Sequence, residues 1–116
     1  MDNKTFCEIW SDVQQAKDID AFVSDWATSS AFLDPENPDQ EIDSGLMEQL
    51  QVLWRVANAP FKELLQLLGL GQTACSVRFC ISLRTVQAWA AEERRCPPYI
   101  RLMMAEITGV MRLRNV

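Results

Sequence analysis

Apolar residues recur along this chain at helical spacing, and no stretch shows the alternation of a half-buried strand. Two amphipathic stretches open the sequence, each with carboxylates opposite its apolar face. Their apolar residues are Phe6, Ile9, Trp10 and Val13 in the first, and Ile19, Phe22, Val23 and Trp26 in the second. Lys17-Asp18 is the expected break between them. The pattern predicts an N-terminal helical region over residues 1–33.

An acidic segment containing two prolines follows. Pro35 and Pro38 exclude a regular helix, and from Asp34 to Glu48 there are six acidic residues and no basic one. We therefore predict a solvated linker over residues 34–45. Helical periodicity then returns and predicts a connecting helix over residues 46–57, with its apolar positions at Leu46, Leu50, Leu53, Trp54 and Ala57.

The pattern of apolar, proline and glycine positions in residues 58–116 predicts a bundle of short helices. Asn58 and Pro60 indicate the N-cap and first turn of one helix, and Gly69-Leu70-Gly71 indicates its end. The apolar residues of this helix are Phe61, Leu64, Leu65 and Leu68. A last helix is predicted from Pro97-Pro98 onward, and the stretch past Gly109 is expected to reach outward. The stripe expected to face the core is Ile100, Met103, Met104, Ile107, Val110 and Met111.

Residues 72–91 predict two short helices that cross at a tight turn. Ser82 is expected to cap the second helix. The apolar positions that would lock the pair are Cys75, Phe79, Ile81, Val86 and Trp89. This spacing is typical of a DNA-reading helix-turn-helix, although an ordinary helical pair with a solvated face is the alternative. The outward positions of the second helix, suited to base edges, are Leu83, Arg84, Gln87 and Ala88.

Residues 58–107 resemble the lambda-repressor-like (XRE-type) helix-turn-helix family, and within it short regulators of bacterial mobile elements or phage. The residues that carry the resemblance are Leu68-Gly69-Leu70, Gln72, Ile81 to Gln87, Trp89 and Arg94 to Tyr99. The resemblance implies an all-α bundle whose second motif helix enters the major groove. It implies base contacts by the four outward residues above. The implied phosphate contacts are Gln72, Ser82, Thr85, Arg94 and Arg95.

Three departures from the family pattern carry structural expectations. Ser76 stands at the position where the family usually has a small residue, which is a mild change. Cys80 replaces the turn glycine, so it must hold a left-handed backbone at a cost of roughly 1 kcal/mol. Leu65 and Ala90 replace an arginine–glutamate pair, and packing is expected in place of the ion pair.

Charge is divided unevenly along the 116 residues, whose formal net charge is −5. Residues 1–58 carry three basic and twelve acidic side chains, whereas residues 59–116 carry eight basic and four acidic ones. The basic half contains the predicted motif, as contact with phosphate requires.

The residues needed for most enzyme chemistry are missing. There is no histidine, no nucleophile beside a recognisable base and no phosphate loop. The four cysteines form no metal-binding spacing, and Cys75 is expected to be a core thiol. We therefore expect no enzymatic activity, cofactor or metal. Free thiols and the absence of a signal peptide or membrane-spanning stretch predict a cytoplasmic protein.

The function predicted from the sequence is sequence-specific transcriptional control, as a repressor of bacterial or phage-derived DNA. The alternative is a protein-binding module, antitoxin-like or a phage-encoded inhibitor, that uses its acidic half on a protein partner. A homodimer on double-stranded DNA is expected, because one short helix reads only a few base pairs. Its interface is expected in the N-terminal helices with Trp10 and Trp26, or else at Val110, Met111 and Leu113.

Overall fold

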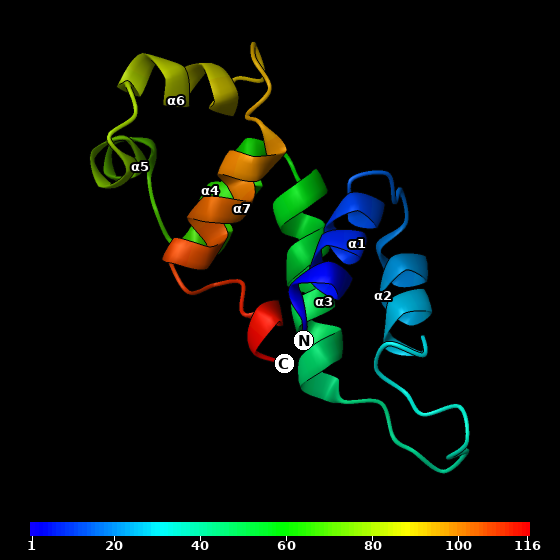
Figure 1. Ribbon diagram of the computed structural model, residues 1–116. Helices are drawn as coiled ribbons and strands as arrows, with labels where there is room; N and C mark the ends of the chain where they lie inside the picture. The colour runs from blue at the N-terminus through cyan, green and yellow to red at the C-terminus, as the bar shows by residue number, and fades with distance from the viewer. The chain divides into compact units, whose positions relative to one another are not determined.

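The computed structural model describes residues 1–116, and all of its regular elements are helical (Figure 1). The predicted all-α class is confirmed. The chain divides into two compact units. Unit 1 comprises Met1–Arg55 and Met111–Val116, and unit 2 comprises Val56–Val110. None of the helices combines the length and apolar character needed to cross a membrane.

Unit 1 contains α1 (Asn3–Val13), α2 (Ile19–Ala27) and most of α3 (Ser44–Asn58). Asp2 begins α1 by accepting a hydrogen bond from the Thr5 amide at 2.7 Å. Asp18 begins α2 in the same way through the Asp20 amide at 3.1 Å. The predicted break at Lys17-Asp18 is therefore confirmed, and its cause is an N-cap aspartate. The linker between α2 and α3 contains no helix from Asp34 to Asp43.

Most of the predicted apolar positions of the first three helices form the core of unit 1, whereas Trp10, Ile19, Trp26 and Trp54 are half-buried. In Figure 1, α1 lies beside α3, and α2 lies beside α1. Two indoles join these helices: Trp26 donates to the Asp12 carboxylate at 2.7 Å, and Trp54 donates to the Ala16 carbonyl at 3.0 Å. The buried side chains are Phe6, Ile9, Val13, Phe22, Val23, Ala27, Leu46, Leu50 and Leu53.

The last six residues belong to unit 1, and the expectation that they reach outward was wrong. Met111 and Leu113 are buried, the latter at the start of the 3₁₀ helix η1 (Leu113–Asn115). The Arg112 amide donates to the side-chain oxygen of Gln49 at 2.5 Å. The Arg114 guanidinium lies 4.0 Å from the centroid of the Phe6 ring. A cation over an aromatic face and two buried apolar side chains hold this end of the chain in place.

Unit 2 contains four short helices: α4 (Phe61–Leu68), α5 (Gln72–Phe79), α6 (Leu83–Ala90) and α7 (Pro98–Ile107). Helix α6 packs on both α5 and α4, and α4 packs on α7. Phe61 of α4 meets Trp89 of α6 edge to face, with ring centroids 5.4 Å apart. The predicted apolar face of α4 is buried throughout. Asn58, expected to cap α4, is instead the last residue of α3, and Pro60 occupies the cap position.

Three consecutive helices of unit 2 end in the same way. A residue with left-handed backbone follows α4, α5 and α6: Gly69 (φ 71°), Cys80 (φ 55°) and Glu92 (φ 58°). In each case the next amide reaches back to a carbonyl five residues earlier, as Ile81 does to Ser76 at 3.0 Å. These are Schellman motifs, for which glycine is the preferred residue. The predicted left-handed conformation of Cys80 is confirmed.

Replacing Cys80 by glycine is expected to raise the free energy of unfolding by about 0.5–1 kcal/mol, because the Cβ penalty of the left-handed conformation disappears. Urea unfolding followed by circular dichroism measures this difference. Cys80→Ala is the matched control, since it removes the thiol and keeps the Cβ. Equal stability of the glycine and alanine variants would contradict the backbone explanation.

The face of α7 that packs inward differs from the predicted stripe. Arg101, Leu102, Met104 and Ala105 are buried, whereas Met103 and Ile107 are more than half exposed. The prediction was wrong for these two residues because it treated the helix as an ordinary amphipathic one, with all its large apolar side chains inward. A buried arginine occupies part of the inward face instead.

Arg101 completes the end of α3 within unit 2. Its Nε donates to the Val56 carbonyl at 2.6 Å, and its Nη2 donates to the Ala59 carbonyl. The helical partner of the Val56 carbonyl would be the amide of residue 60, which is proline and has no N–H. Arg101 therefore satisfies a carbonyl that Pro60 leaves open. Burial lowers the pKa of Arg101.

Candidate nucleic-acid interface

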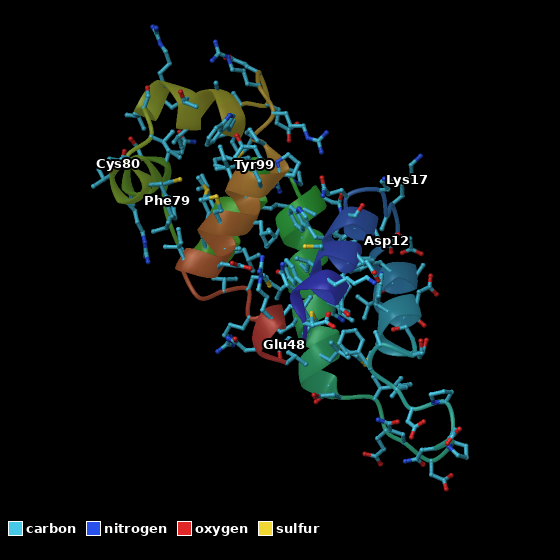
Figure 2. All side chains as sticks on the ribbon, viewed as in Figure 1. Asp12, Lys17, Glu48, Phe79, Cys80 and Tyr99 are labelled. Atoms are coloured by element: carbon cyan, nitrogen blue, oxygen red, sulfur yellow. The ribbon has the colours of Figure 1, made fainter.

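The crossing of α5 and α6 is set by a three-residue turn, Cys80 to Ser82. The hydroxyl of Ser76 donates to the Ile81 carbonyl at 2.5 Å, and the Ser76 carbonyl accepts the Ile81 amide. Ser76 therefore stabilises the turn through both its hydroxyl and its carbonyl, a role that the sequence analysis did not predict. Cys75, Val86 and Trp89 are buried as predicted, while Phe79 and Ile81 are half-buried. Figure 2 labels Phe79 and Cys80 at the end of α5.

Both helices begin without a side-chain cap. Gly71 precedes α5, and Ser82 precedes α6 as predicted, yet the Ser82 side chain makes no capping hydrogen bond. Ser82 therefore occupies the N-cap position as predicted, but it does not form the expected capping hydrogen bond. The first amides of each helix receive no side-chain acceptor, and such amides are suited to bind a phosphate oxygen. Gln72, the first residue of α5, is half-buried at one of these ends.

The predicted base-reading residues lie together on the outward face of α6. Arg84 and Gln87 are exposed, Leu83 is 38% exposed and Ala88 is half-buried. A pocket of about 390 Å³ brings several of them together with two predicted phosphate contacts. Its lining residues are Arg84, Thr85, Gln87, Ala88, Ala91, Glu93 and Arg94. The sequence-based assignment did not include Glu93, which lines the same pocket.

The residues around this surface carry less net positive charge than the division of charge between the two halves of the sequence indicated. From Leu64 to Ala91 there are two arginines and no carboxylate, which favours an approaching phosphate. The following residues, Glu92 to Arg95, are two acids and two bases. Unit 1 carries five basic and twelve acidic side chains, and unit 2 carries six and four. Unit 2 is the more basic unit, but Arg112 and Arg114 belong to unit 1.

Arg94 and Arg95 follow α6 and are both exposed. They differ in the pockets that they line. Arg94 lines the pocket on α6, whereas Arg95 does not. Both line a second pocket of about 340 Å³ in unit 2. Neither side chain makes a hydrogen bond or an ion pair. Arg94 is thus placed beside the predicted base-reading residues, and Arg95 lines only the second pocket.

Two of the three cysteines of unit 2 are part of its core. Cys75 and Cys96 are buried, and Cys80 is exposed. Burial raises the pKa of the Cys75 thiol and raises that of Cys96 to about 12, so both are neutral near pH 7. The prediction of a core thiol at Cys75 is confirmed. No group of three or more histidine, cysteine or carboxylate residues is placed to hold a metal ion.

Comparisons of the chain with protein-family models, with curated proteins and with solved structures find no match.

Proposed function

We propose that unit 2 is a helix-turn-helix module of the lambda-repressor-like kind and that it binds double-stranded DNA by sequence. The observation that carries this proposal is the outward face of α6. Arg84 and Gln87 project from its first two turns, in a stretch of 28 residues from Leu64 to Ala91 that contains no carboxylate. A helix so exposed can enter the major groove with its N-terminal residues at the bases.

Each side chain then has a chemical role. Arg84 donates two hydrogen bonds to a guanine edge, Gln87 pairs with an adenine edge, and Leu83 and Ala88 contact thymine methyl groups. The uncapped amides that begin α5 and α6 bind backbone phosphates, with Gln72, Ser82 and Thr85 beside them. Arg94 and Arg95 add phosphate contacts at the edge of the groove. A protein that occupies a promoter in this way excludes polymerase, so we propose repression as its effect.

Selection of duplexes from a randomised pool by the full-length protein tests this function. A single enriched motif is expected at two salt concentrations, with affinity falling as salt rises because phosphate contacts release counterions. Recovery of no motif above the input pool, at low salt as well, would overturn the proposal and favour the protein-binding alternative.

We further propose that the DNA-binding form is a homodimer joined through α7. Of the surfaces expected from the sequence, Met111 and Leu113 are buried, and Trp10 and Trp26 are half-buried. Tyr99, Met103 and Ile107 of α7 are exposed by 62%, 55% and 59%. Four-residue spacing places them on one helix face. In two antiparallel copies, Met103 meets Met103 and Tyr99 meets Ile107, as a two-fold interface requires.

Met103→Glu is expected to convert the homodimer to a monomer at micromolar concentration, because it buries two carboxylates against each other at the two-fold axis. Sedimentation velocity measures the change. Val77→Glu is the control: Val77 is 74% exposed on α5, outside the proposed interface, and its variant should remain dimeric. A wild-type chain that is monomeric and occupies a single half-site would contradict the dimer.

A further inference from the structure

The second pocket of unit 2 has the features of a small-ligand site. Its volume of about 340 Å³ lies at the lower end of the range for ligand pockets, which suits a molecule with one ring. The residues that give it chemical character are Phe61, Trp89, Glu92, Arg94, Arg95 and Arg101. All of them belong to unit 2. We propose that this pocket binds a small organic anion, a carboxylate or phosphate that carries a flat apolar group, and that the bound anion weakens DNA binding.

Three arginines make the pocket attractive to an anion. Arg101 is 7% exposed, and its guanidinium donates to the Val56 and Ala59 carbonyls. A buried charge of this kind acts more strongly than one in water. Arg94 and Arg95 have side chains without hydrogen bonds or ion pairs, so both are available for paired contacts to a carboxylate or phosphate. Glu92 is the single carboxylate that lines the pocket.

The apolar part of the ligand follows from the two aromatic rings. Phe61 and Trp89 pack edge to face with an interplanar angle of 69°. They are 3% and 6% exposed, and both line the pocket. A ligand with a single flat ring could contact them there, whereas a larger apolar group would have to displace the packing of α4 against α6.

Arg94 connects this pocket to the proposed DNA surface, and this part of the inference rests on the proposed function. Arg94 lines both the second pocket and the pocket on α6. An anion that holds Arg94 removes it from a DNA phosphate and adds negative charge beside the duplex. Since coupling between two sites is reciprocal, DNA should weaken binding of the anion by the same factor.

Benzoate is the probe for the first test, with benzamide as its uncharged counterpart. In ¹H–¹⁵N spectra of the full-length protein without DNA, millimolar benzoate is expected to shift the Trp89 indole and neighbouring amides saturably. Benzamide should not do so. Arg95→Ala should lower benzoate affinity by about tenfold, and Glu92→Gln should raise it by about threefold. Arg78→Ala, an exposed arginine outside the pocket, should leave it unchanged.

Two results would overturn the anion site: no saturable shift with benzoate or phenyl phosphate, or equal shifts with benzamide. The coupling is tested separately on the selected duplex, whose affinity should fall by about five- to tenfold at saturating benzoate. Unchanged duplex affinity would overturn the coupling and leave the anion site intact. Benzoate binding by a protein that selects no duplex would overturn the proposed function alone.

Discussion

Replacing Arg101 by alanine is expected to lower the free energy of unfolding by about 3–5 kcal/mol, the largest effect of any single change considered for unit 2. The substitution leaves the Val56 and Ala59 carbonyls without the donor that now reaches them. Val56 has no alternative within the helix, because the residue four positions on is Pro60. The Arg101→Ala substitution also removes a cation from the C-terminal end of α3, where the helix dipole favours positive charge.

Urea unfolding followed by circular dichroism measures the loss, and amide hydrogen exchange of α6 shows whether unit 2 is the part affected. Arg78→Ala is the matched control. Arg78 is exposed and lies 6.0 Å from the centroid of the Phe79 ring, so its removal should change stability by less than about 0.5 kcal/mol. If the Arg101 variant loses no more than this control, the carbonyl-capping role is wrong.

Arg84→Ala is expected to relax the choice of sequence, whereas Arg95→Ala is expected to weaken binding to all sequences alike. A two-point contact of an arginine with guanine contributes about 1–3 kcal/mol of discrimination against other bases. A phosphate contact carries no such information, and its loss should lower the salt slope by about 1. The positions agree with this division, because Arg84 lies in the first turn of α6 and Arg95 lies beyond its end.

Selection from randomised duplexes with each variant, followed by affinities at several salt concentrations, separates the two roles. The variants form their own matched pair, since both remove one exposed arginine from the same unit. An unchanged motif with unchanged mismatch penalties for Arg84→Ala would remove Arg84 from the base-reading residues. A changed motif for Arg95→Ala would show that Arg95 is more than a phosphate contact.

The sequence by itself determined the elements that depend on near neighbours. Helical spacing predicted α1, α2 and the buried face of α4, because residues three and four apart share a helix face whatever lies elsewhere in the chain. Local backbone chemistry predicted the stop at Gly69 and the left-handed Cys80. The outward residues of α6 followed from the same spacing, once the buried partners on its other face were identified.

The tertiary structure decided what depends on distant partners. Arg101 is 45 residues from the carbonyl of Val56, and Arg112 is 63 residues from Gln49. No periodic pattern relates such pairs, so the buried arginine and the return of the last residues to unit 1 could not be read from spacing. The same holds for α7, whose large apolar side chains at Met103 and Ile107 are exposed. The spacing of residues in a helix predicts which side chains share a face, but which face is buried depends on the surfaces that pack against the helix.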